Sequence, residues 1–79
     1  MSHERTLGQL IRELDHVFGL KVRLRNTNSG GFYLEGPAGE IASVGDNSYN
    51  TLMSPRDQEA ICENLGLDAT LLGLNPRRD

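Results

Sequence analysis

The sequence predicts a small α+β domain, a two-layer αβββα sandwich in which two helices cover one face of a three-stranded antiparallel sheet. Three observations lead to this fold: an apolar pattern of helical period over residues 7–18, an alternating strand over residues 20–25, and a helix-start signal at residues 54–57. With 79 residues, the chain is expected to form a single domain over residues 1–79.

The first expected helix covers residues 7–18. Its apolar positions recur at helical spacing: Leu7, Leu10, Ile11, Leu14, Val17 and Phe18. Thr6 and Gln9 match a capping box, in which each side chain accepts a hydrogen bond from the other residue's backbone N–H. Gly19 stands where a left-handed residue ends a helix.

Residues 20–25 alternate apolar and cationic side chains. In an extended strand, Leu20, Val22 and Leu24 share one face, which we expect to join the core. The opposite face carries the residues that we call the basic ridge: Lys21, Arg23 and Arg25.

A hairpin of residues 31–35 and 40–44 is expected around the turn Gly36-Pro37-Ala38-Gly39. A four-residue turn would place Glu35 opposite Glu40, Leu34 opposite Ile41 and Phe32 opposite Ser43. Phe32, Leu34 and Ile41 would then face the core, and Tyr33, Glu35 and Ala42 would lie beside the basic ridge. The two opposed glutamates would repel each other unless Arg23 or Arg25 lies near them.

The second helix is expected to start at Ser54, with Pro55 at its first position and Asp57 near the positive end of its dipole. Its apolar stripe is predicted to hold Ala60, Ile61 and Leu65, with Cys62 at the margin as a buried structural thiol. Gly66 ends it, with Leu67 packing back, and Asp68 caps a last short turn. Residues 75–79 resemble a frayed tail.

Charge and cysteine usage limit the classes of partner. The formal net charge is −3, whereas a general nucleic-acid binder is usually basic. Residues 20–34 carry three cations and no acid, and residues 57–68 carry four acids and no base, so the field is bipolar. One cysteine, no signal-peptide pattern and no long apolar run predict a cytoplasmic protein without a membrane partner.

Two groups of residues are candidate sites. Lys21, Arg23 and Arg25 with Tyr33 form a basic sheet face that suits phosphates or another acidic partner, with Tyr33 as a stacking surface. The alternative, which the sequence favours, is a solvated face paired with glutamates. Tyr49 with Met53 is a candidate protein-contact patch, whereas Leu52 or Met53 as a core plug is the alternative. We expect no catalytic set, no metal site and no small-molecule cofactor.

Several stretches resemble the HicA (YcfA-like) toxin family, whose domain is similar to the double-stranded-RNA-binding fold. The stretches are FGLKVRLRN, SGGFYLEGPAGEIASVG and MSPRDQEAICENLGLD, and together they cover most of the chain. The resemblance implies the same αβββα order. HicA toxins carry a Gly-Ser-His element at the start of the second strand, and the chain has Asn28-Ser29-Gly30-Gly31 there. The family's RNA-cleaving histidine is therefore missing.

These observations lead to three hypotheses. The first is a non-catalytic binding module, regulatory or accessory, that acts through a protein partner or as a homodimer. The second is a HicA-like RNA-binding protein, related to toxin–antitoxin systems, that uses the basic sheet face. The third is a ribonuclease in which His16 replaces the missing histidine.

Overall fold

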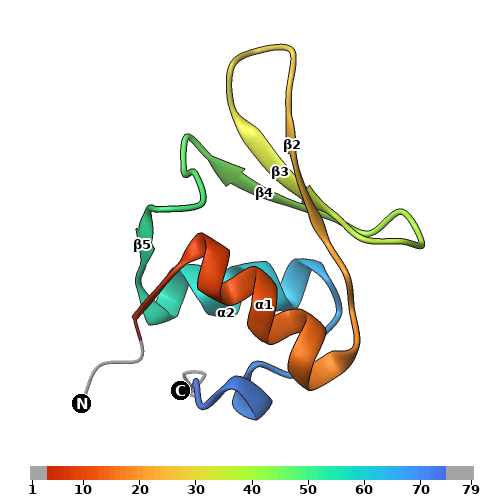
Figure 1. Ribbon diagram of the computed structural model, residues 1–79, viewed down its shortest axis with the longest axis vertical. Helices are drawn as coiled ribbons and strands as arrows, with labels where there is room; N and C mark the ends of the chain where they lie inside the picture. The colour runs from red at the N-terminus through yellow and green to blue at the C-terminus, as the bar shows by residue number, and fades with distance from the viewer. Residues whose placement is uncertain (1–3, 75–79) are drawn as a thin grey trace.

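The computed structural model describes residues 4–74 and has the predicted two layers (Figure 1). The antiparallel sheet has the order β2 (Arg23–Asn26), β3 (Phe32–Glu35) and β4 (Ile41–Gly45). The helices α1 (Leu7–Phe18) and α2 (Pro55–Asn64) lie on one side of the sheet. The small α+β architecture is therefore confirmed, while the tail predicted at residues 75–79 lies outside the described residues.

Three short elements complete the chain. The strands β1 (Arg5–Thr6) and β5 (Leu52–Met53) form a separate two-stranded sheet, which the sequence did not predict. The 3-10 helix η1 (Ala69–Leu72) is the expected last turn, and the Asp68 side chain caps it by accepting a hydrogen bond from the Thr70 backbone N–H. Within residues 4–74, neither helix has the length and apolar character needed to cross a bilayer.

Helix α1 begins and ends as its sequence predicts. Thr6 Oγ1 accepts a 3.1 Å bond from the Gln9 backbone N–H, and Gln9 Oε1 accepts a 2.8 Å bond from the Thr6 N–H. The two bonds complete the capping box and satisfy two donors that a helix leaves free at its start. Gly19 ends the helix with φ 69°, a conformation that glycine adopts without steric cost.

The start of α1 is also held by the segment before β5. The backbone N–H groups of Leu7 and Gly8 donate to the carbonyls of Thr51 and Tyr49, at 2.9 and 2.8 Å. A Cβ on Gly8 would lie 3.2 Å from the Tyr49 carbonyl oxygen, so glycine permits this close approach. Residues 49–53 therefore dock against the helix start instead of forming a free loop.

The turn between β3 and β4 is one residue shorter than expected. The Gly36 N–H donates to the Glu40 carbonyl at 2.8 Å, and the Gly39 N–H donates to the Gly36 carbonyl at 3.2 Å. Gly39 has φ 92°. Residues 37–39 thus form a three-residue hairpin loop in which a tight turn is followed by a left-handed glycine.

This loop changes the predicted register by one residue. Glu35 lies opposite Ile41, not Glu40, and Leu34 lies opposite Ala42. Since side chains alternate between the faces, the shift exchanges the two faces of β4. Ala42 and Val44 are buried, whereas Ile41 is 56% exposed, so the placements of Ile41 in the core and Ala42 on the outer face were wrong.

The helices and the inner face of the sheet enclose one apolar core. Its buried residues are Leu7, Leu10, Leu14, Val22, Leu34, Ala42, Val44, Met53, Ile61, Cys62, Leu65, Ala69, Leu72 and Leu74. Leu20, Leu24 and Phe32 pack against it, half-buried. The strand that was predicted at residues 20–25 begins only at Arg23. The apolar residues of the predicted segment nevertheless face the core, as expected.

Helix α2 keeps its predicted start and end but not its whole apolar stripe. Ser54 Oγ accepts a bond from the Asp57 N–H, and Pro55 occupies the first turn. Leu67 N–H donates to the Cys62 carbonyl at 2.8 Å, which is the bond that a Schellman motif predicts. Ala60, however, is exposed, and the position of a core residue is taken by Gln58, which is fully buried.

Candidate functional site

The side of the sheet opposite the helices carries six side chains, which we call the outer sheet face. The strand register arranges them in two rows, Arg23–Glu35–Ile41 and Arg25–Tyr33–Ser43. Each residue is exposed or half-buried. The structure therefore brings Arg23, Arg25 and Tyr33 together as predicted and adds Ile41, which the sequence-based register had placed in the core.

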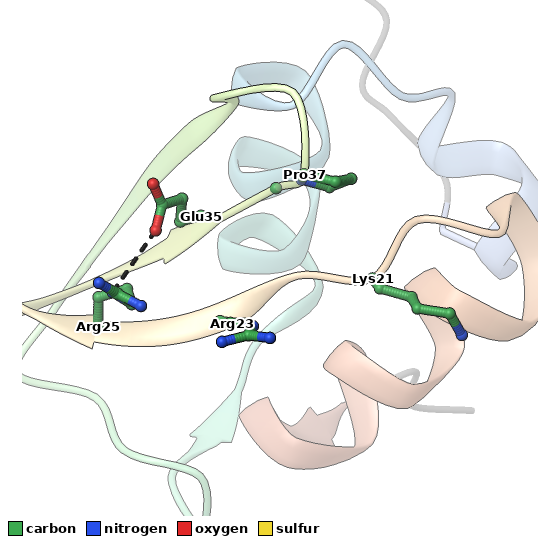
Figure 2. A pocket seen from close by; sticks show the side chains of 6 residues that line it. Lys21, Arg23, Arg25, Glu35 and Pro37 are labelled. Carbon is green, nitrogen blue, oxygen red and sulfur yellow. Dashed lines mark ion pairs between the residues drawn. The ribbon is translucent and has the colours of Figure 1, made fainter.

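Arg25 is paired with an acid on the neighbouring strand. Its Nε lies 3.5 Å from Glu35 Oε1, along a diagonal of the two rows (Figure 2). Both side chains remain partly exposed, so the pair contributes at most about 1 kcal/mol to stability. Its main effect is on charge, because a carboxylate balances one cation of the basic ridge.

Lys21 is drawn away from the sheet. Its Nζ contacts both carboxylate oxygens of Asp15 on α1 at 3.1 Å. Figure 2 shows the Lys21 side chain extending away from Arg23 and Arg25. The pair is well exposed and therefore weak, but the Asp15 carboxylate balances the charge of a second cation of the basic ridge.

Arg23 differs from the other two cations. It is exposed and makes no ion pair or side-chain hydrogen bond with another residue of the described range 4–74. It lines an open hollow of about 430 Å³ together with Lys21, Arg25, Glu35, Gly36 and Pro37 (Figure 2). Arg23 is thus the member of the basic ridge whose charge is available to a ligand.

Tyr33 lies at the centre of the second row. It is half-buried, opposite Arg25 on β2 and opposite Ser43 on β4. The exposed part of its ring therefore lies between an arginine and a small polar side chain. With Arg23 and Ile41, it gives the outer sheet face aromatic, cationic and apolar components.

The second candidate site is not present as predicted. Met53 is 2% exposed and belongs to the core, as the alternative interpretation proposed. Tyr49 is exposed, and so is Leu52 on β5. The Tyr49 side chain and carbonyl lie against Gly8, so this residue helps to fix the start of α1.

Among the described residues, the cysteine and the histidine lie in different surroundings. Cys62 is buried, and desolvation raises the pKa of its thiol, an effect that the nearby positive charge of Arg5 opposes and that Glu59 and Asp68 reinforce. His16 is exposed in the last turn of α1, beside an open hollow that it shares with Arg12, Glu13 and Asp15. Among residues 4–74, no three His, Cys, Asp or Glu side chains are grouped to hold a metal ion.

The HicA resemblance places the Gly-Ser-His element at residues 28–31, of which residues 28–30 are exposed and Gly31 is closely packed. The Gly31 N–H donates to Thr27 Oγ1 at 3.0 Å, and the Gly31 carbonyl accepts from the Thr27 N–H at 2.9 Å. A Cβ on Gly31 would lie 3.2 Å from the Gly45 carbonyl oxygen. The backbone of β4 therefore leaves little room for a side chain at this position.

Sequence reasoning missed a polar group inside the core. Arg5 Nη1 donates to Gln58 Oε1 at 2.7 Å, and Arg5 Nη2 donates to the Leu72 carbonyl at 3.2 Å. Gln58 Nε2 donates to the Met53 carbonyl at 3.0 Å. The group joins β1, β5, α2 and η1. None of its residues belongs to the outer sheet face, so we assign it a structural role.

The chain was compared with known families, curated proteins and solved structures. No protein-family model, no curated protein and no solved structure matches this chain.

Proposed function

We propose that this chain is a non-catalytic binding module that contacts a partner protein through the outer sheet face, in a regulatory or accessory role. The observation that carries the proposal is that exposed Ile41 shares one sheet face with Tyr33 and with Arg23, which makes no ion pair with another residue of the range 4–74. Arginine and aromatic side chains are enriched in protein interfaces, where they surround apolar contacts. Action in the cytoplasm, without a cofactor, is part of this proposal.

The charges of the face indicate the chemistry of the partner. Glu35 balances the charge of Arg25, and Asp15 balances that of Lys21. Of the basic ridge, Arg23 is left without an acidic partner among residues 4–74. A partner that offers one or two carboxylates beside an apolar side chain would match Arg23 and Ile41 together. Charge complementarity of this kind sets the orientation and rate of association more than its final affinity.

A site-specific photo-cross-link tests the proposal. A photoreactive amino acid at position 41, introduced into the full chain and irradiated in a lysate of the source cells, is expected to yield one discrete adduct. The same amino acid at position 71 is the control, because Leu71 is an equally exposed apolar residue on η1. Adducts from both positions, or from neither, would contradict the proposal.

Charge reversal makes this test specific. Arg23→Glu is expected to abolish the adduct from position 41, because it places an acid opposite the partner's acid. Arg56→Glu is the matched control, since Arg56 is an exposed arginine on α2 and not part of the outer sheet face. Equal loss of the adduct in both variants would assign the effect to net charge and not to this surface.

A HicA-like RNA-binding role is the second candidate. It is favoured by the presence of Arg23 and Tyr33 on the same open face, since a cation and an aromatic ring suit a phosphate and a stacked base. It predicts affinity for single-stranded RNA that falls as salt rises, with a logarithmic slope of about −0.7 for each phosphate contacted. Arg23→Glu would remove most of this affinity. Unchanged fluorescence anisotropy of a labelled RNA at low salt would exclude this role.

A further inference from the structure

The β4 strand leaves one edge of the sheet open. It pairs with β3, and no described residue adds a strand on its other side. The bond from the Gly36 N–H to the Glu40 carbonyl fixes the alternation along the strand. Ala42 therefore directs its backbone groups to β3, whereas Ile41 and Ser43 direct theirs to the free edge. Such an edge is a template for another extended chain.

A groove runs beside this edge. A hollow of about 160 Å³ lies between β4 and α2, with Ser43 and Val44 on one wall and Asp57, Ala60 and Ile61 on the other. Ala60 is exposed, and its small side chain leaves space over the helix. An added strand would therefore find room for its side chains between the sheet edge and α2.

The groove is acidic. Asp57 is the one charged residue among the described residues that line it. Asp57 is exposed and makes no ion pair with another residue of the range 4–74. Elsewhere on α2, Glu59 and Glu63 outnumber Arg56. Pairing of two copies through β4 would bring two such acidic helices together, which disfavours a second copy as the occupant.

We propose that the β4 edge and the β4–α2 groove accept an extended segment of a partner protein that carries a basic side chain. The segment adds to the sheet beside β4 through main-chain hydrogen bonds to Ile41 and Ser43. Its basic side chain pairs with Asp57, and an apolar side chain lies over Ala60. This surface uses the backbone of Ile41 and Ser43 but neither Arg23 nor Tyr33, so either proposal can fail without the other.

Titration of the ¹⁵N-labelled chain with a synthetic peptide tests the inference. The probe is a capped peptide with the sequence of residues 20–26, which alternates apolar and cationic side chains. The control peptide has glutamate at the three cationic positions. We expect the cationic peptide to shift the amide signals of Ile41, Ser43 and residues 57–61, and the acidic peptide to leave them in place.

Two variants localise the binding. Ala60→Arg fills the hollow and adds a positive charge, and Asn64→Arg adds the same charge at the far end of the same helix as a control. We expect the first to weaken peptide binding by about tenfold or more and the second by far less. Ser43→Pro removes an edge donor without breaking the β3–β4 ladder and should weaken it about fivefold.

Several outcomes would overturn the inference. They are no signal shift with the cationic peptide, equal shifts with both peptides, and shifts confined to β2 and β3. Signals of Ile41 and Ser43 that change with protein concentration alone would show a second copy at this edge, and would overturn the assigned occupant.

Discussion

Arg5 and Gln58 are joined by a 2.7 Å hydrogen bond across 53 positions of the chain. Gln58 is fully buried, so its side-chain oxygen depends on protein donors. Gln58 Nε2 in turn donates to the Met53 carbonyl, and Arg5 also reaches the Leu72 carbonyl. One polar group thus fixes the chain segments on both sides of α2.

Arg5→Met is expected to lower the free energy of unfolding by about 1–3 kcal/mol, because Gln58 Oε1 loses this donor in a buried place. Gln58→Leu also destabilises the protein, since the Met53 carbonyl loses its donor. In the double variant, the two effects are expected to be non-additive by about 0.5–3 kcal/mol. Urea unfolding of the four proteins measures this coupling, with the exposed Arg12→Met as control. Simple additivity would show that the bond carries no net coupling.

The register of β4 gives a second prediction, based on one residue of each face. Ile41→Thr is expected to change the free energy of unfolding by no more than about 0.5 kcal/mol, because Ile41 is exposed. Val44→Thr should lower it by about 1–3 kcal/mol, since it buries a hydroxyl group. Both substitutions keep a β-branched residue in the strand. The reverse order in urea unfolding would support the register first expected from the sequence.

The error in that register has a local cause. The sequence contained the signal of the true loop, because Pro37 suits the first central position of a tight turn and Gly39 suits the left-handed position after it. A loop of four residues, 36–39, between Glu35 and Glu40 would form an equally regular hairpin, and this was the hairpin first expected. Ile41 and Val44 did not distinguish the two, because each register offers the core one of these β-branched residues.

Contacts within a few residues were predictable, and contacts between distant segments were not. The capping box of Thr6 and Gln9 follows from spacing alone, because both partners lie in one turn. Nothing near Arg5 or Gln58 in sequence indicates that they meet. Arg23 and Arg25 were placed on the correct face, but the ion pair that draws Lys21 to Asp15 depends on the arrangement of α1 and the chain that follows it.

The capping box predicts a matched pair of variants. Thr6→Ala is expected to lower the free energy of unfolding by about 1 kcal/mol, because the Gln9 N–H loses its acceptor. Thr6→Ser keeps the hydroxyl oxygen and should retain most of the stability. Thermal unfolding followed by circular dichroism measures both. An equal loss in the two variants would attribute the effect to packing of the threonine methyl group.

The Arg25–Glu35 pair predicts a gain of binding from a loss of charge. Glu35→Gln releases Arg25, so the outer sheet face would present two available arginines in place of one. We expect tighter binding of a short anionic probe, such as oligouridylate, with a stability change below about 1 kcal/mol. Glu13→Gln on α1 removes the same charge elsewhere and is the control for the change in net charge. Equal gains in both variants would assign the effect to net charge alone.

The buried thiol of Cys62 predicts how stability changes at high pH. Desolvation raises the pKa of Cys62, so the folded protein keeps the thiol proton where the unfolded chain loses it. The corresponding stabilisation is complete below about pH 8.5, the ordinary pKa of a thiol, and is lost as the pH rises toward the higher folded pKa. The difference in unfolding free energy between the native chain and Cys62→Ala should therefore decrease from neutral to alkaline pH. Urea unfolding of both proteins in reducing buffer measures it, and the comparison with Cys62→Ala removes any pH dependence that the two proteins share. A difference that stays constant across this range would mean that the thiol ionises equally well in the folded and unfolded chain.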